Sequence, residues 1–258
     1  MQVLTDAQWA ELAPLIEECR PRGKTRHHDL RRTIEAIIWR HQNGAKWRAI
    51  PAELGAWWAA AQTFIRWARL GVWERLLEAA QAQGIALGMT FLDGTNIRAH
   101  QKAAGAARKR GSAAQRDARE ALGRSRGGYG TKACVIADGS GHAVAFALAP
   151  GQAPELALGP GLLDCLPGVP GWVVGDRGYG SHGFRERIWD SGSRPAIPSK
   201  RNEAAVACPE WIYNNRNLVE RLWARLKAWR AVATRYEKTA CSFMGVLCLA
   251  AAWDRIKN

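Results

Sequence analysis

The sequence lacks a hydrophobic run long enough to span a membrane, and it lacks a recognisable signal sequence. Its most apolar stretch, 241–253, is shorter than the roughly 20 residues that a spanning helix needs, so we expect a buried helix there. The first residues, Met-Gln-Val-Leu-Thr-Asp, have neither the basic nor the apolar region of a secretory signal. These absences predict a cytoplasmic protein without a membrane partner.

Cysteine is sparse and has no pairing pattern. The six cysteines include no C-x-x-C spacing, which argues against a zinc site and against a disulfide framework. We expect them to be reduced residues of the core. The sequence also contains no internal repeat.

Acidic residues are few relative to basic ones. The chain has 23 Asp and Glu against 37 Lys and Arg, and its formal net charge is +14. Such an excess implies a polyanionic partner, most simply nucleic acid. An anionic membrane surface is the weaker alternative, because no amphipathic basic anchor is evident.

Apolar residues, in contrast, are plentiful. Of the 258 residues, 47% are hydrophobic, which is ample for a core in one large domain or in a small and a medium one. Most of the 13 tryptophans lie at helical spacing among other apolar residues, so we expect them to pack the core.

The first third of the chain is expected to be helical, with helices near 5–18, 30–43 and 57–70. A short helix, a turn at Gly44 and a longer helix with polar and basic tips fit a helix-turn-helix, although ordinary helical pairs share this pattern. In that interpretation the second helix would enter the major groove of DNA. Its candidate base-reading residues are Gln62, Thr63, Arg66 and Arg69.

Segment 81–88 is expected to be a connector, after which the periodicity changes to that of a strand, 89–97, which carries Asp93. The next segment, 98–126, has nine Lys or Arg against two acids and almost no large apolar residue. We expect it to be a mobile basic insert that packs no core. It either orders on DNA or stays a solvated loop.

The remaining pattern predicts a mixed sheet. Strands at 129–137 and 142–148 are joined by a hairpin signal at 138–141. Helix, strand, helix and strand are then expected at 154–165, 171–175, 182–190 and 195–198, followed by the helix at 213–230. This order is that of an RNase H-like domain. The expected fold is therefore α+β or α/β, with a helical helix-turn-helix domain at 1–85 and an RNase H-like domain at 86–258.

Two aspartates, Asp93 and Asp176, each follow a short apolar run. Parallel strands would bring two such residues side by side, and a helix packed on the sheet can add Glu220. Three converging carboxylates repel one another unless divalent cations lie between them, and hard oxygen ligands suit Mg²⁺ or Mn²⁺. Two such ions can cleave a phosphodiester without a covalent nucleophile. Taken singly, Asp93-Gly also fits a turn, and Asp176 also fits a helix cap.

The helix expected at 213–230 carries a polar stripe. At about 100° per residue, Tyr213, Arg216, Glu220 and Lys227 fall within an arc of roughly 60°, opposite an apolar face. The simplest alternative is the solvated face of an amphipathic helix.

This stripe resembles the signature of the IS4/IS5 group of bacterial insertion-sequence transposases, in which Tyr, Arg, Glu and Lys recur at the same spacing. The resemblance extends over essentially the whole chain. Its other stretches are Gly44-Ala-Lys-Trp47-Arg48-x-x-Pro51, Arg66-Trp67-x-x-x-Gly71-x-Trp73, Leu92-Asp93-Gly-Thr95-x-x-x-Ala-His100-Gln101, Gly130-Thr-Lys132, Ala149-Pro-Gly-Gln152, Gly175-Asp176-Arg-Gly-Tyr179, Ile197-Pro198 and Ala233-Thr-Arg235-Tyr236-x-Lys238.

The resemblance implies a DDE transposase that cuts and joins DNA strands. Asp93, Asp176 and Glu220 would then be the catalytic residues and the ligands of two Mg²⁺ or Mn²⁺ ions. The implied partner is double-stranded DNA, both transposon ends and target, bound by a homodimer in the bacterial cytoplasm and nucleoid. The further DNA contacts expected are Arg216 and Lys227 on phosphates, Tyr213 beside them, and Arg177 and Lys132.

Two residues depart from the common pattern of that group. Gly94 stands where many members have Ser, and Gly180 stands where many have Asp, but neither change removes a ligand. Only 43 residues separate Asp176 from Glu220, so the large β insertion of some members is absent.

Two other functions fit the same residues. A structure-selective endonuclease, such as a junction resolvase, would keep the three acids and the basic surface but would cut without joining. A non-catalytic DNA-binding relic or repressor should have lost at least one acid, and none is missing.

Overall fold

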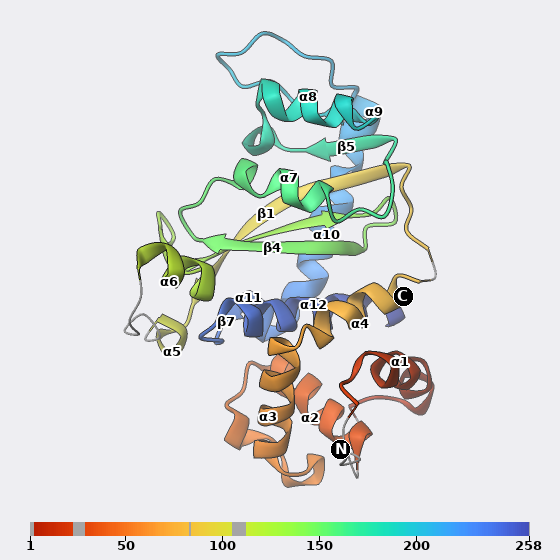
Figure 1. Cartoon of the computed structure of the whole chain (residues 1–258), viewed down its shortest axis with the longest axis vertical. Helices are drawn as coiled ribbons and strands as arrows, with labels where there is room; N and C mark the ends of the chain where they lie inside the picture. The colour runs from red at the N-terminus through yellow and green to blue at the C-terminus, as the bar shows by residue number, and fades with distance from the viewer. Residues whose placement is uncertain (1–2, 23–28, 83, 105–111, 258) are drawn as a thin grey trace.

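The computed structural model describes residues 3–22, 29–82, 84–104 and 112–257. Its first part is helical, as expected (Figure 1). The side chain of Thr5 accepts a hydrogen bond from the Gln8 amide in a capping box at the start of the first helix, and Gly44, in the left-handed region at φ 60°, ends the second. The elements are α1 (Asp6–Cys19), α2 (Leu30–Asn43), η1 (Trp47–Ala49), η2 (Ala52–Leu54), α3 (Trp57–Arg69) and α4 (Val72–Ala80).

The connection between α2 and α3 differs from the tight turn that the sequence suggested. It contains the two 3-10 turns η1 and η2 and spans residues 44–56, whereas a helix-turn-helix uses a turn of about 3 to 4 residues. The tight junction is instead at Gly71, which adopts φ 66° between α3 and α4. The two-helix expectation holds, and the turn geometry does not.

The second part is built on a mixed sheet whose central strands run in the order β4-β3-β1-β5-β6. Strand β1 is antiparallel to β3 and parallel to β5, and β5 is parallel to β6. This is the predicted RNase H-like arrangement, in which β3 and β4 form the expected hairpin. The strands are β1 (Met89–Ala99), β2 (Gly123–Ser125), β3 (Gly128–Ala137), β4 (Ala143–Pro150), β5 (Trp172–Gly175), β6 (Arg194–Ala196) and β7 (Thr234–Arg235).

Helices cover both faces of this sheet. Neighbouring strand residues point to opposite faces, so Phe91 belongs to one hydrophobic cluster and Leu92 to the other. Buried residues of α10 and α12 belong to the Phe91 cluster, and Leu162 of α7 belongs to the Leu92 cluster. The helical elements of this part are α5 (Gln101–Ala104), α6 (Ala113–Glu120), η4 (Glu155–Ala157), α7 (Gly159–Leu163), η5 (Arg177–Tyr179), α8 (His182–Asp190), α9 (Glu210–Tyr213), η6 (Asn214–Arg216), α10 (Asn217–Lys227), α11 (Arg230–Ala233) and α12 (Ala240–Lys257).

Part of the basic segment 98–126 folds against the sheet, whereas its expected mobility stays a prediction. Strand β1 continues to Ala99, α6 and β2 form within it, and Ala121 and Leu122 are buried. The expectation that this segment packs no core is therefore wrong for its last part, because pairing of β2 with β3 brings these two residues against the sheet. Residues 105–111 lie outside the described chain.

Two smaller expectations also change. The helix expected at 154–165 is divided into η4 and α7. Cys165 and Cys241 are exposed, so not all the cysteines are core residues, although each described cysteine is a free thiol.

The helical part and the sheet share one core. Helices α3 and α4 both pack on α12, and one hydrophobic cluster contains residues from Leu4 to Trp253. Figure 1 shows α4 and α12 between the remaining amino-terminal helices and the sheet. The boundary at 85/86 stays a prediction, but neither side of it buries its apolar surface alone. No helix in the described residues is long and apolar enough to cross a membrane.

Candidate active site

The two aspartates meet through parallel strand pairing. Leu92 of β1 is in register with Gly175 of β5, so the next residues, Asp93 and Asp176, occupy neighbouring positions. Strand β5 ends directly before Asp176, as expected. Asp93, in contrast, lies inside β1, which continues to Ala99. It is not in a turn, and that alternative is wrong because its strand pairs with β3 on both sides of this position.

Arg216 connects two of the three predicted acids. One terminal nitrogen of its guanidinium donates to Asp93 Oδ1 at 2.6 Å, and the other lies 3.1 Å from Glu220 Oε1. The Asp93 side chain is 13% exposed, whereas that of Glu220 is 59% exposed. Burial raises the pKa of the Asp93 carboxyl above its ordinary value, while the hydrogen bond and the charge of Arg216 act against this shift.

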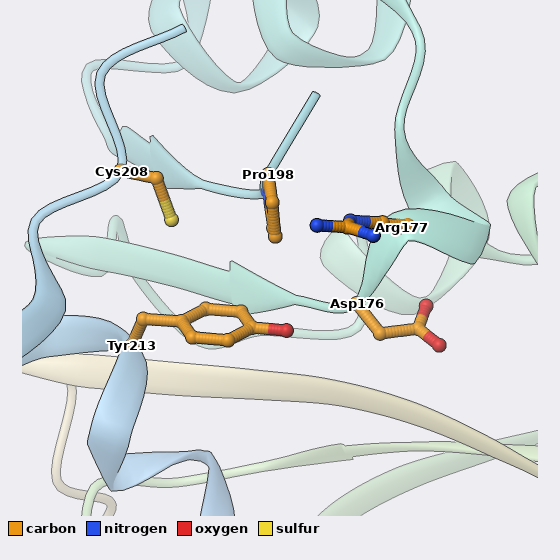
Figure 2. A pocket seen from close by; sticks show the side chains of 5 residues that line it. All are labelled: Asp176, Arg177, Pro198, Cys208 and Tyr213. Carbon is orange, nitrogen blue, oxygen red and sulfur yellow. The ribbon is translucent and has the colours of Figure 1, made fainter. Parts of the chain in front are cut away.

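Asp176 has a local structural partner as well. Its Oδ1 accepts a hydrogen bond from the Gly178 amide at 2.7 Å and so caps η5. The capping interpretation is therefore confirmed, and it leaves the other carboxylate oxygen without a hydrogen bond in the described structure. Asp176 also lines a hollow of about 450 Å³ together with Arg177, Pro198, Cys208 and Tyr213. Figure 2 shows the Tyr213 hydroxyl pointing towards Asp176, with Arg177 projecting above it.

The segment expected as one helix at 213–230 is interrupted. Tyr213 ends α9, residues 214–216 form the 3-10 turn η6, and α10 begins at Asn217. Because a 3-10 turn rotates side chains differently from an α-helix, the predicted arc does not hold for Tyr213. The apolar anchor of α10 is buried as expected: Val219, Leu222, Trp223 and Leu226.

Lys227 does not lie on a solvated helix face. Its ammonium donates to Thr95 Oγ1 at 2.9 Å and lies 5.8 Å from the centre of the Trp223 ring. Thr95 is two residues beyond Asp93 on the same strand and therefore points to the same side of the sheet. Lys227 at the end of α10 and Arg216 in η6 thus both reach β1, and only Glu220 of the stripe resembles a solvated position.

Glu155 is an acid at this site that the sequence reasoning missed. It lies in η4, and its Oε1 accepts a hydrogen bond from Lys132 Nζ at 2.7 Å. A Cβ atom built on Gly94 would be 2.6 Å from its carboxyl carbon, and one on Gly178 would be 3.4 Å from its Oε2. Glu155 therefore lies against the residue after Asp93 and close to Asp176. The only signal in the sequence was its position three residues after the Ala149–Gln152 stretch.

This contact changes how two residues are understood. The Lys132 side chain is 12% exposed and ion-paired, so the structure gives it a partner other than DNA, and its DNA contact stays a prediction. Gly94 makes room for Glu155, because a serine there would require the carboxyl group to move. Gly180 is also tightly surrounded, with its Cβ position 3.3 Å from the Arg185 guanidinium. The Arg185 guanidinium itself forms an ion pair with Glu203, at 3.5 Å.

The three acids are the type of ligand that a divalent cation prefers, but their carboxylates do not lie together in this arrangement. Carboxylate oxygens are the ligands that Mg²⁺ and Mn²⁺ prefer, and a positive group, the Arg216 guanidinium, already lies between Asp93 and Glu220. Within the described ranges, however, no three His, Cys, Asp or Glu side chains are grouped closely enough to hold a metal. Glu220 would have to leave Arg216 to complete such a group, and its exposure leaves it free to do so.

The predicted base-reading residues do not share one face. Gln62, Arg66 and Arg69 are exposed on α3, on a stripe with Ile65. Thr63 points inward and is only 7% exposed. The expectation that Thr63 reads DNA is therefore wrong for this structure, because a base edge cannot reach a side chain packed in the core.

Comparisons with known families match both ends of the chain. Residues 4–77 match the family described as "Putative transposase of IS4/5 family", and residues 173–257 match the family described as "Transposase DDE domain". The second match contains Asp176, Arg216, Glu220 and Lys227.

Curated relatives match about half of the chain, and two of them are named as putative transposases. A "Putative transposase for insertion sequence element IS6501" from Brucella ovis is 31% identical over 124 residues, which are 47% of this chain and 95% of the relative. The corresponding protein for IS402 from Burkholderia cepacia is 26% identical over 142 residues, 50% of this chain and 65% of that one. An uncharacterized protein, y4sN of Sinorhizobium fredii, is 32% identical over 108 residues, 42% of this chain and 86% of the relative.

A solved structure is only remotely similar. A piggyBac transposase synaptic complex with hairpin DNA aligns with 79% of this chain and 44% of its own at 10% identity. The TM-score is 0.36, which is too low to establish a common fold.

Proposed function

Since the chain belongs to the IS4/IS5 group of insertion-sequence transposases, we propose that it binds the terminal inverted repeats of its element and transfers DNA strands. The observation that supports this most directly is the contact of Arg216 with both Asp93 and Glu220, beside Asp176. The contact joins strand β1 to η6 and the first turn of α10, so one guanidinium holds two of the proposed acids close together.

Asp93, Asp176 and Glu220 would hold the divalent cations, for which two Mg²⁺ or Mn²⁺ ions are proposed. When bound, such ions activate the attacking water or 3′-hydroxyl and stabilise the leaving oxygen. The protein's own part is to bring the acids together and to hold the strand. Asp93 is fixed within the sheet and Asp176 is fixed by its cap, whereas Glu220 is free to rotate.

Arg216 is the residue that changes partner in this proposal. A guanidinium binds a carboxylate and a phosphate through the same paired N–H groups. A DNA phosphate that replaces Glu220 on Arg216 would release the Glu220 carboxylate towards Asp93 and Asp176. Binding of the strand and assembly of the three acids would then be one event. Tyr213 and Arg177 line the hollow beside Asp176, and Lys227 contacts Thr95, two residues after Asp93 on β1. These three side chains would hold the neighbouring phosphates.

The exposed stripe of α3 is proposed to read the terminal repeat. Gln62, Arg66 and Arg69 are exposed together, and Arg or Gln side chains discriminate base edges in the major groove by about 1 to 3 kcal/mol each. In this proposal residues 1–85 recognise DNA and residues 86–258 carry the chemistry. The active form is a homodimer on DNA, in the cytoplasm and on the nucleoid.

The test uses the full chain and DNA that carries the inverted repeats flanking its own coding sequence. We expect 3′-hydroxyl nicks and joined products in Mg²⁺ or Mn²⁺, and neither in EDTA. Cleavage that survives EDTA would refute the three-carboxylate site. Nicks that are never joined would favour a structure-selective endonuclease, and specific binding without any cleavage would favour a relic.

A further inference from the structure

A second concave surface lies between the helical part and the sheet part, away from the three acids. Its volume is about 900 Å³. One wall comes from the end of α2, the following loop and α3, and the other from residues 100–102, the end of α6 and residues 236–242. Figure 1 shows α3 next to β7 and α5, at the border between the two parts. We call this surface the basic groove.

The acids of the basic groove are neutralised within the protein. Glu237 is 7% exposed and forms an ion pair with Arg40. Glu120 is 4% exposed and lies 2.6 Å from Arg119. Both carboxylates are therefore buried and paired, and neither presents a net negative charge at the surface.

The exposed charges of the basic groove are all positive. Lys46 and Arg69 lie on one wall and Lys102 and Lys238 on the other, and all four are exposed. None of them takes part in an ion pair with another described residue. Unpaired cations facing each other across a hollow repel one another, and an anion between them removes that repulsion.

The basic groove is continuous with the proposed recognition surface. Ile65 and Arg69 of the exposed α3 stripe also form part of its wall. A DNA molecule lying on α3 would therefore have its backbone directed along the groove towards the sheet part. Regularly spaced phosphates match cations on two opposing walls better than a single small anion does.

We infer that the basic groove binds the sugar–phosphate backbone of double-stranded DNA through Lys46, Lys102 and Lys238. This inference rests on the proposed function, because it takes the same DNA as the ligand. It adds a second set of phosphate contacts, which the two parts of the chain form jointly and which lie outside the catalytic site. Gly44 supports this joint surface, since its Cβ position is 2.9 Å from Arg230 and 3.1 Å from Tyr236, so the two walls are in direct contact there.

The test compares two triple variants of the full chain on a short mixed-sequence duplex. The first is Lys46→Gln/Lys102→Gln/Lys238→Gln. The control, Arg187→Gln/Arg194→Gln/Lys257→Gln, removes the same charge from exposed positions outside both the groove and residues 1–85. Arg69 is left unchanged, so base reading by α3 is not altered.

Each lost phosphate contact lowers the slope of log affinity against log salt by about 0.9, so the groove variant should lose about 2.7. Between 50 and 200 mM salt its affinity would then fall about 40-fold less than that of the wild type. The control variant should keep the wild-type slope. Equal slopes in the two variants would overturn the inference.

A second measurement needs no variant. Acetylation of lysines in the wild-type protein, followed by mass spectrometry, should show slower modification of Lys46, Lys102 and Lys238 when the duplex is bound, and no change at Lys257. Unchanged rates at the three groove lysines would also overturn the inference. If they are unprotected while DNA is still cut in Mg²⁺, the groove fails and the proposed function stands. If they are protected but no cleavage occurs, the inference about the groove stands and the proposed function fails.

Discussion

Replacing Arg216 by Gln should destabilise the protein and make its stability depend on pH. The Arg216 guanidinium forms an ion pair with Asp93, and the two side chains are 21% and 13% exposed. Removing one partner of a fully buried ion pair costs about 3 to 5 kcal/mol. Because this pair retains some exposure, and because Arg216 Nε is itself buried without a partner, we expect about 2 kcal/mol at pH 7. The exposed contact with Glu220 adds little.

The sign of the pH effect follows from Asp93. Its folded pKa is raised above the ordinary 3.8 by burial, and the charge of Arg216 limits that rise. In Arg216→Gln the pKa should rise further. A carboxyl whose pKa is higher in the folded protein than in the unfolded chain binds more protons in the folded state. The free energy of unfolding therefore falls as the pH rises from 3.8 through the folded pKa. The deficit of the variant should therefore be small near pH 4 and largest at neutral pH.

Urea unfolding followed by tryptophan fluorescence in EDTA measures this deficit. With an m-value of about 3 kcal/mol/M, a loss of about 2 kcal/mol moves the midpoint by about 0.7 M. The matched control is the same substitution in an Asp93→Asn background, where both the deficit and its pH dependence should nearly vanish. A loss that is the same at all pH values, or that persists in the Asp93→Asn background, would refute the assignment of the effect to this ion pair.

Three further changes test the remaining contacts. Glu220→Gln should abolish strand cleavage but leave folding unchanged and DNA affinity equal or slightly higher, because this exposed carboxylate is near the proposed phosphates; residual cutting in a single-turnover assay would remove Glu220 from the catalytic set. Arg216→Ala and Lys227→Ala should each weaken DNA binding and reduce the salt slope by about 0.9, and an unchanged slope in a titration series would mean that they serve only the scaffold. Gly94→Ser should lower cleavage because its side chain meets Glu155, and the shorter acid in Gly94→Ser/Glu155→Asp should restore part of it; if the double variant is no better than the single one, the steric explanation is wrong.

The sequence alone was sufficient for most of the elements, and it supplied the candidate site residues, whose roles stay proposals. Apolar runs bounded by turn residues predicted β3, β4 and β5, and the end of β5 at Asp176 was correctly located. The parallel pairing of β1 with β5 was expected from the two aspartates, because parallel strands bring the residues that follow them to one edge of the sheet. These features are local, since hydrophobic periodicity and turn chemistry are written in consecutive residues.

The tertiary structure decided which polar groups are partners. Arg216 and Asp93 are 123 residues apart in sequence, and Lys227 and Thr95 are 132 apart. No periodicity relates such residues, because their contact depends on how η6 and α10 lie across β1. The same holds for Glu155 against Gly94, which becomes visible only when η4 packs beside the sheet.

Packing also decided which exposed residues are available to a ligand. Thr63 directly follows the exposed Gln62 in sequence, yet it faces the core because α3 packs on α2 and α12. The four cations of the basic groove come from segments around 46, 69, 102 and 238, which only the shared core brings together. The sequence determined the charge of these residues and the helices and strands that carry them. The long-range burial of apolar surface determined which charges are paired inside and which face the solvent.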